Sequence, residues 1–479
     1  MREPPRILQT WEHKRAHGEI HHAVTWDELF FDLSLVAAIA SASTSLDFWQ
    51  HHGKDDHHGD SDDHGHDDGH HGRFLSGAAA GASMPIGASV AHFCLVTGMI
   101  TSCFIKATVQ NATVKAKDLT MVLSLFLRAC CVLAIGAEAG QGGDRLHAVF
   151  AFFAFYCLVT VVQSLVMLKF TNAANALNSA IAAGASAAVA AGFAFALKGG
   201  WEMTAGGYVA WALCTPFFFM GHVVVDILRT VLRRGQPDGR VMVPLNVAFV
   251  CERDGLLVIV TCGEAINAAS AVLARASGRG ATLTVTAFAA MLCGLLLKLM
   301  YFELQGNIGE HALRASWPRG IAFGLLHLPL WTGVAGVGAA LHLASGDRGN
   351  DWRSRERRLF CGFLAATLVV LAAIQATHGA RGRAHRRIRR EVRIAVRLAS
   401  AAVVAALAWL PDDVHAMDIV LVAAIVMLFD FLFEFYGRRP PSMDPAAPDV
   451  ELSRPSAKSD AEAPRTSAAS ESAPGGGVV

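Results

Sequence analysis

The sequence predicts an all-α fold, a polytopic transmembrane bundle of about 12 helices, and three observations support this. The 479-residue chain is 53% hydrophobic and only 17% charged. Apolar runs recur along the chain, and each is about 20 residues long, the length of a helix that crosses a bilayer core of roughly 30 Å. Short clusters of arginine and lysine separate the runs, as in membrane-protein loops. The net charge of +1 gives no basic surface for binding nucleic acid. The apolar runs make the lipid bilayer the expected partner, and the sequence does not define the oligomeric state.

Twelve apolar runs are bounded by charged residues, glycine or proline. The fifth consists mostly of alanine and glycine, and we keep it because small residues favour close helix packing. The eleventh is short. The runs cover residues 26–46, 84–105, 118–137, 146–169, 174–197, 206–228, 247–270, 281–303, 319–343, 359–378, 393–410 and 417–436.

The distribution of positive residues predicts the orientation. More arginines and lysines lie inside when the N-terminus is cytoplasmic, which makes residues 1–25 and the C-terminus cytoplasmic. The loop between the ninth and tenth runs fits less well, because the arginines of residues 348–358 then lie outside. The first run begins with acids and lacks a small-residue cleavage site, so we expect no signal peptide.

Two segments are expected to lie outside the membrane. Residues 437–479 are rich in proline, serine and alanine and predict a disordered tail. Residues 47–72, between the first two runs, consist almost entirely of histidine, aspartate and glycine. This loop is either a solvated linker or a site for a divalent transition metal such as Zn, Ni or Cu, and no other cofactor is required. Its candidate ligands are His51, His52, His57, His58, His64, His66, His70 and His71.

Acidic residues gather where apolar runs begin or end. Glu28 and Asp32 lie four residues apart at the start of the first run, so on a helix they share one face. Ionisable groups at membrane depth face a cavity or a partner, and we therefore predict an acid-lined inner vestibule. Near helix C-termini the dipole disfavours acids, so Glu303 and Glu434 need a partner such as Lys298, Arg438 or a bound cation. The acids concerned are Glu28, Asp32, Asp226, Glu252, Glu303, Asp430 and Glu434.

Three ionisable residues lie deeper in the predicted helices. Arg128 is in the middle of the third run and Glu264 is deep in the seventh. They either neutralise each other as a packing pair or belong to a proton- or cation-coupled site. His327, in the ninth run, is better explained as a hydrogen-bonded core histidine than as a ligand. Arg253 follows Glu252 directly and is interpreted as a local ion pair or an interface anchor.

Two segments carry a family resemblance. WDELFFDLSLVAAIA in the first run and CERDGLLVIVTCGEAI at 251–266 resemble the signature segments of the bacterial low temperature requirement A family. LMYFE, ending at Glu303, and HLPLWTG at 327–333 resemble its later elements, and the likeness extends to about residue 436. The His/Asp-rich loop and the tail look like additions, and Glu303 stands where the family tends to have aspartate. The resemblance implies a polytopic membrane protein and assigns no defined biochemical activity.

An internal repeat is also visible in the sequence. Glu28 laid over Glu252 aligns the first and seventh runs, and His222 laid over Asp430 aligns the ends of the sixth and twelfth. Both pairs are about two hundred residues apart, which indicates two parallel halves of six helices. The alternative is a chance likeness between hydrophobic helices.

Function remains divided between two classes. The chain has no GxSxG, HExxH, Walker or dinucleotide-binding motif in a suitable context, so we expect no enzyme, and an intramembrane enzyme using His327 is a minor alternative. The first hypothesis is a proton- or cation-coupled transporter of a small ion or solute. The second is a non-transporting stress- or metal-sensing membrane protein whose charges are structural. The hypotheses differ in whether the acids converge on a cavity or pair off one to one.

Overall fold

A computed structural model describes residues 6–7, 24–49, 86–115, 119–141, 145–232, 244–276, 281–305, 311–344, 354–378, 388–411 and 413–437. Within these ranges, a long helix lies at each of the twelve predicted runs. These helices are α2 (Trp26–Ser43), α3 (Ile86–Asn111), α4 (Leu119–Ala139), α5 (Leu146–Thr171), α6 (Ala174–Lys198), α7 (Ala205–Leu232), α8 (Val247–Ala276), α9 (Ala281–Gln305), α11 (Trp317–Ala344), α12 (Ser354–Thr377), α13 (Arg390–Leu407) and α14 (Ala416–Gly437). Four short elements complete the described part: the 3₁₀ helix η1 (Thr44–Trp49), the helix α10 (Ala312–Ala315), and the antiparallel pair of strands β1 (Arg6–Ile7) and β2 (Val114–Lys115).

Ten of these helices are long and apolar enough to cross a membrane. The two that fall outside this set are α7 and α13. In α7 the described apolar stretch is the shorter segment Ala205–Cys214, while α13 carries Arg390, Arg393 and Arg397 on its first two turns. The chain is therefore a multi-pass membrane protein, and ten spans are supported where twelve were expected.

The outer faces of the helices are apolar, which fits a lipid environment. Leu165, Leu213, Phe288 and Phe429 are each at least half exposed although they lie in the middle of long helices. In water, so many exposed apolar side chains would form a large hydrophobic surface that promotes aggregation. In a bilayer they contact acyl chains instead.

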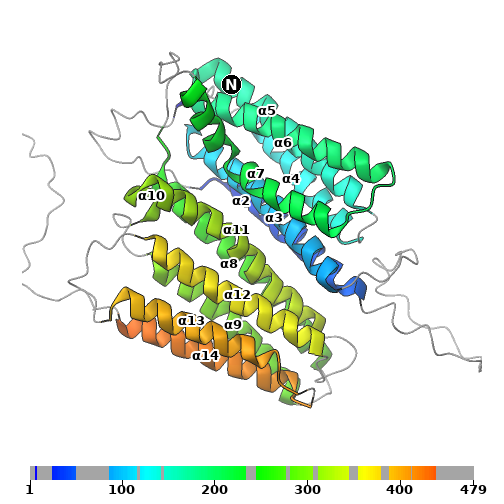
Figure 1. The fold of residues 1–479 in the computed structure, drawn as a ribbon, viewed down its shortest axis with the longest axis vertical. Helices are drawn as coiled ribbons and strands as arrows, with labels where there is room; N and C mark the ends of the chain where they lie inside the picture. Colours follow the sequence, from blue (N-terminus) through cyan, green and yellow to red (C-terminus); the bar gives the residue numbers. More distant parts are fainter. Residues whose placement is uncertain are drawn as a thin grey trace, which may run out of the picture. The chain divides into compact units, whose positions relative to one another are not determined.

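The long helices pack as two sets, α2–α7 in one and α8, α9 and α11–α14 in the other (Figure 1). In the first set, α2 packs on α3 and α4, α4 on α5, α5 on α6, α6 on α7, and α7 back on α3. In the second set, α8 packs on α9 and α11, α11 on α12, α12 on α13, α13 on α14, and α14 back on α9. Contacts of α2 with α8 and of α3 with α11 join the two sets.

Small residues permit the closest of these approaches. A Cβ added at Gly136 of α4 would lie 2.5 Å from the Ala38 backbone of α2. A Cβ added at Gly338 of α11 would lie 2.7 Å from the Glu264 side chain of α8. Helix association in a bilayer depends on such contacts, because lipid is as apolar as the side chains and gives no hydrophobic drive.

The segments predicted to lie outside the membrane are mostly beyond the described residues. These include nearly all of residues 1–25, residues 50–72 with all eight candidate histidine ligands, and the tail from residue 438.

Candidate functional site

Asp32 of α2 forms an ion pair with Arg253 of α8. Each carboxylate oxygen accepts a hydrogen bond from one guanidinium nitrogen at 2.6 Å, and both side chains are buried. The guanidinium also lies over the Phe104 ring, 4.9 Å from its centroid. Buried charges need such a partner because burial removes their hydration. The expectation that Arg253 would pair locally with Glu252 or anchor an interface was therefore wrong.

The predicted vestibule of Glu28, Asp32 and Glu252 is not formed. Glu28 completes a capping box with Thr25 at the start of α2 and accepts a 2.7 Å hydrogen bond from Asn111. Glu252 is exposed on α8, whereas the next residue, Arg253, is buried. Glu28 and Asp32 do share a buried face, as expected from their spacing. Their partners are an amide and a guanidinium, so these acids stabilise helix contacts.

A second buried ionic network joins α12, α13 and α14. Arg397 donates to Asp430 at 3.0 Å and to Gln375 at 3.1 Å, and Arg393 pairs with Glu434. All five side chains are at most 5% exposed. The partner of Glu434 is thus Arg393, and neither Lys298 nor Arg438 was needed to explain it. Asp430 is likewise neutralised by a cation of the protein itself.

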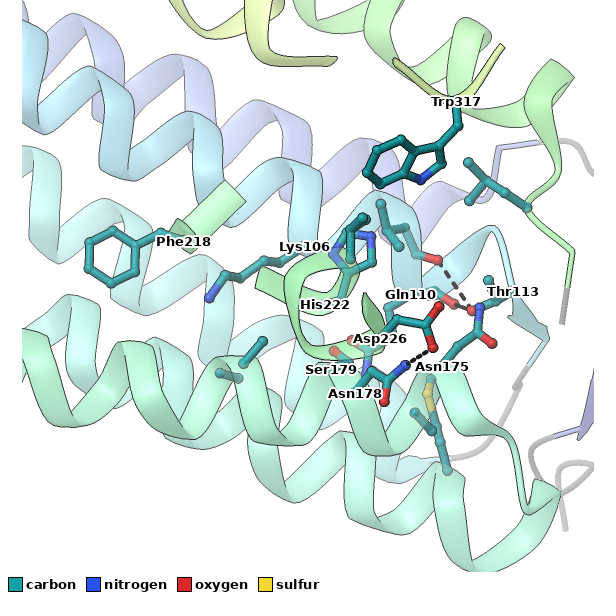
Figure 2. Close-up of a pocket in the computed structure, with 17 residues that line it drawn as sticks. Lys106, Gln110, Thr113, Asn175, Asn178, Ser179, Phe218, His222, Asp226 and Trp317 are labelled. Atoms are coloured by element: carbon teal, nitrogen blue, oxygen red, sulfur yellow. Dashed lines mark hydrogen bonds between the residues drawn. The ribbon is translucent and has the colours of Figure 1, made fainter. Parts of the chain in front are cut away.

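A cavity of about 250 Å³ with polar and apolar walls lies between α3, α6 and α7 (Figure 2). Its ionisable lining residues are Lys106 of α3 and His222 and Asp226 of α7. Amide and hydroxyl side chains from α3 and α6 add to the lining, as does the exposed Trp317 of α11. Of the predicted acids, only Asp226 lines this cavity. The half-buried Glu303 does not.

Two arginines orient the amides that line the cavity. Asn178 donates to Asp226 at 2.9 Å and accepts from Arg229 through its amide oxygen. Gln110 accepts from Arg128 at 2.8 Å and donates to Ser164 at 3.1 Å. An amide has one acceptor and one donor end, so the arginine fixes which end is free to bond elsewhere.

Lys106 and His222 are less fully bonded. The Lys106 ammonium donates to the Ser186 hydroxyl at 3.2 Å and approaches the Cys157 sulfur at 3.8 Å. No carboxylate of the described residues lies within ion-pair distance of it. His222 makes no hydrogen bond to any described residue. In Figure 2 the His222 ring is drawn between the Lys106 ammonium and the Asp226 carboxylate, which extend in opposite directions. Asp226 is already bonded to Asn178, whereas Lys106 and His222 have no carboxylate partner among the described residues.

The three deeper residues have separate environments. Arg128 bonds to Gln110 and lies 5.6 Å from the centroid of the Tyr156 ring, while Glu264 accepts a 3.0 Å hydrogen bond from Ser43. The proposed Arg128–Glu264 packing pair is therefore not formed. One carboxylate oxygen of Glu264 is buried without a hydrogen-bond partner among the described residues.

His327 is a fully bonded core histidine. Its Nδ1 contacts the Phe323 carbonyl at 2.7 Å, and its Nε2 contacts the Tyr301 hydroxyl at 3.0 Å. A carbonyl can only accept, so Nδ1 carries the proton and Nε2 accepts from the tyrosine. Both ring nitrogens are occupied, as the core-histidine interpretation expected.

A histidine in the connection between α9 and α11 is also structural. His311 is buried against Phe323 and His378. Burial, together with the nearby His378, lowers the pKa of His311 to about 3. The neutral ring caps α10 by accepting from the Leu313 amide at 3.3 Å.

No group of three histidine, cysteine, aspartate or glutamate side chains could hold a metal ion within the described ranges. The ten cysteines are free. The metal hypothesis concerns only the loop of residues 51–71, which lies outside those ranges.

Comparison with known proteins assigns the family. The model of the bacterial low temperature requirement A protein matches residues 23–428. The chain belongs to the bacterial low temperature requirement A family. The two signature segments of this family member meet through the Asp32–Arg253 pair, one residue from each. Searches of curated proteins and of solved structures found no match.

Some residues of the ionic network and of the cavity were not selected from the sequence, although the sequence contained signals for them. Arg393 and Arg397 are four apart, as are Asp430 and Glu434, and that matched spacing suits a ladder of two ion pairs. Lys106 directly follows the second predicted run, and the continuation of α3 to Asn111 places it within the helix. Asn178 in an alanine-rich helix gave a weaker signal.

Proposed function

We propose that this low temperature requirement A family member is a secondary transporter that binds a small polar solute between α3, α6 and α7. The observation that carries the proposal is the cavity lined by the ionisable side chains of Lys106, His222 and Asp226. Ionisable side chains within membrane helices are costly, and they commonly face a partner or a cavity that a solute, water or an ion can enter. The volume of about 250 Å³ accommodates roughly eight water molecules or a solute of that size.

Asp226 and His222 are the candidates for coupling solute movement to protons. A carboxylate and an imidazole can each bind and release a proton, and both line the cavity. The buried acids Asp32, Asp430 and Glu434 are less suited to this role, because each already holds an arginine. Glu264 has one oxygen without a described partner, but it does not line this cavity. Proton coupling is therefore favoured over a chain of acidic cation sites.

The order of helix contacts supports a repeat of six helices. If α2–α7 are matched in order with α8, α9 and α11–α14, each main contact of one set has its counterpart in the other. In this alignment Asp226 corresponds to Glu434 and His222 to Asp430. In the second set, arginines of α13 pair with Asp430 and Glu434. In the first set, the corresponding His222 and Asp226 line the cavity. Two parallel halves, of which one has a cavity, fit a secondary transporter built from two structural repeats.

Reconstitution tests the proposal. The purified chain is placed in liposomes with an entrapped pH dye, a pH gradient is imposed, and small polar solutes are added in pools. We expect at least one pool to cause proton movement that empty liposomes lack. Asp226→Asn should reduce that movement strongly, since an amide cannot release a proton. Asp27→Asn, at an exposed position on α2, is the matched control.

The second candidate function is a non-transporting membrane protein whose charges hold helices together. The one-to-one pairing of Asp32 with Arg253 and of Asp430 with Arg397 favours it. Folded protein that moves no pool of solute, in either direction of the gradient, would favour this second function over transport.

A further inference from the structure

We propose that the solute bound in the cavity is a small organic carboxylate whose negative charge is held by Lys106. This inference rests on the proposed function, since it names the ligand class of the same site.

Lys106 is the cation that lines the cavity itself. Behind the lining, Arg128 bonds to the lining residue Gln110 and Arg229 bonds to the lining residue Asn178. The described lining also holds one carboxylate, that of Asp226, which accepts a hydrogen bond from Asn178. Because Lys106 forms no ion pair with a described residue, an anion in the cavity would contact an unneutralised charge.

Lys106 is the cation with capacity for a ligand. Its described partners are a hydroxyl and a sulfur atom, both weak substitutes for a carboxylate. An ammonium at membrane depth is costly without an opposite charge. A bound carboxylate would supply that charge and a charge-assisted hydrogen bond. His222, which donates to no described residue, also lines the cavity and can offer a ligand a hydrogen bond.

The size and walls of the cavity indicate an organic anion. Space for roughly eight water molecules exceeds what one halide ion needs. Much of the wall is apolar, with Val109, Ala183, Phe218 and Val223 among the lining residues. A carboxylate on a short apolar body matches both the cation and these walls.

The first experiment measures the sign of the charge in the cavity. Ser179 lines it from α6, so Ser179→Cys presents a thiol there. The chain is treated with anionic and cationic methanethiosulfonate reagents of equal length, and the rates are corrected for the native cysteines. We expect the anionic reagent to react faster. Adding Lys106→Met should lower the anionic-to-cationic ratio about tenfold, whereas Lys106→Arg should preserve it. Lys298→Met, at a half-buried lysine of α9 outside the cavity, is the matched control.

The second experiment identifies the ligand class with the unmodified chain. Propionate and succinate are titrated into detergent-purified protein, alongside propionamide, succinamide, n-propylammonium and chloride. We expect binding heat from the carboxylates alone. Lys106→Met should weaken their binding about tenfold or more, because it removes a hydrogen bond between two charged groups.

The outcomes separate the ligand class from the transport proposal. Binding of the amides or of propylammonium, or a faster cationic reagent, would overturn the carboxylate assignment and leave the cavity as a solute site. Binding of chloride equal to that of the carboxylates would also overturn it, in favour of an inorganic anion. If neither Ser179→Cys nor Ala183→Cys reacts with any reagent and no compound binds, the cavity is closed to solutes and both proposals fail.

Discussion

Removing the charge of Asp32 should destabilise the protein. In Asp32→Asn one amide oxygen can still accept from Arg253, but the amide nitrogen then faces a guanidinium nitrogen, and both are donors. Arg253, only 1% exposed, keeps its charge without an anion. The contact of Arg253 with the Phe104 ring is unaffected and offsets only a part of the loss.

The expected loss is large compared with total stability. Two hydrogen bonds of 2.6 Å between charged groups are involved, and both side chains are nearly inaccessible to solvent. Breaking a buried pair of this kind by removing one partner costs about 3–5 kcal/mol. Folded proteins are stable by only about 5–15 kcal/mol, so Asp32→Asn should unfold at a clearly lower temperature.

The assay is thermal unfolding of the detergent-purified chain, followed by size-exclusion chromatography of the heated samples. Arg253→Met and the double variant Asp32→Asn/Arg253→Met complete a cycle. Because the double variant leaves no charge unpaired at this point, it should lose less stability than the two single variants added together. Asp27→Asn, at an exposed acid of the same helix, should change stability by less than about 1 kcal/mol. Wild-type stability for Asp32→Asn, or a fully additive double variant, would refute the role of the pair.

Three further predictions concern packing, the His/Asp-rich loop and topology. Gly136→Ala should destabilise the chain by about 1–3 kcal/mol, because its Cβ meets the α2 backbone, whereas Gly192→Ala, which meets nothing within 4 Å, should be neutral or stabilising in the same unfolding assay. Deleting residues 53–71 should remove most divalent transition-metal binding, measured by titration, and leave the unfolding temperature without metal unchanged, since that tract has no apolar residue to add to a core. A cysteine introduced at 60 should react with an impermeant reagent on intact cells and one at 236 should not; the reverse pattern would invert the topology.

The long helices could be predicted because each one is a local property of the sequence. A run of about 20 apolar residues is sufficient evidence, and a helix is present at every predicted run. The number of spans was less secure, because crossing the membrane depends on more than helix length. In α13, Arg393 and Arg397 interrupt the apolar pattern, and their burial depends on acids supplied by α14.

The sequence predicted which charged residues lie within helices better than it predicted the residues with which they interact. Asp32 was recognised as an unusual acid, but its partner Arg253 lies 221 residues away in the sequence. The same limit applies to Arg128 and Glu264, which were expected as a pair and instead contact Gln110 and Ser43. The cavity was missed because it depends on how three helices pack together.

The pairing of the buried acids changes which ion the transport hypothesis should involve. A cation site needs carboxylates that are free to bind it, yet Asp32, Asp430 and Glu434 each hold an arginine of the protein. An ion entering at any of them would have to displace a buried guanidinium and leave it unpaired, at a cost of several kcal/mol. Lys106 presents the opposite situation, because its described partners are uncharged and a ligand carboxylate would displace no ion pair. The three arginine-paired acids therefore offer no cation site, and Lys106 is the reason why we propose an anion as the substrate.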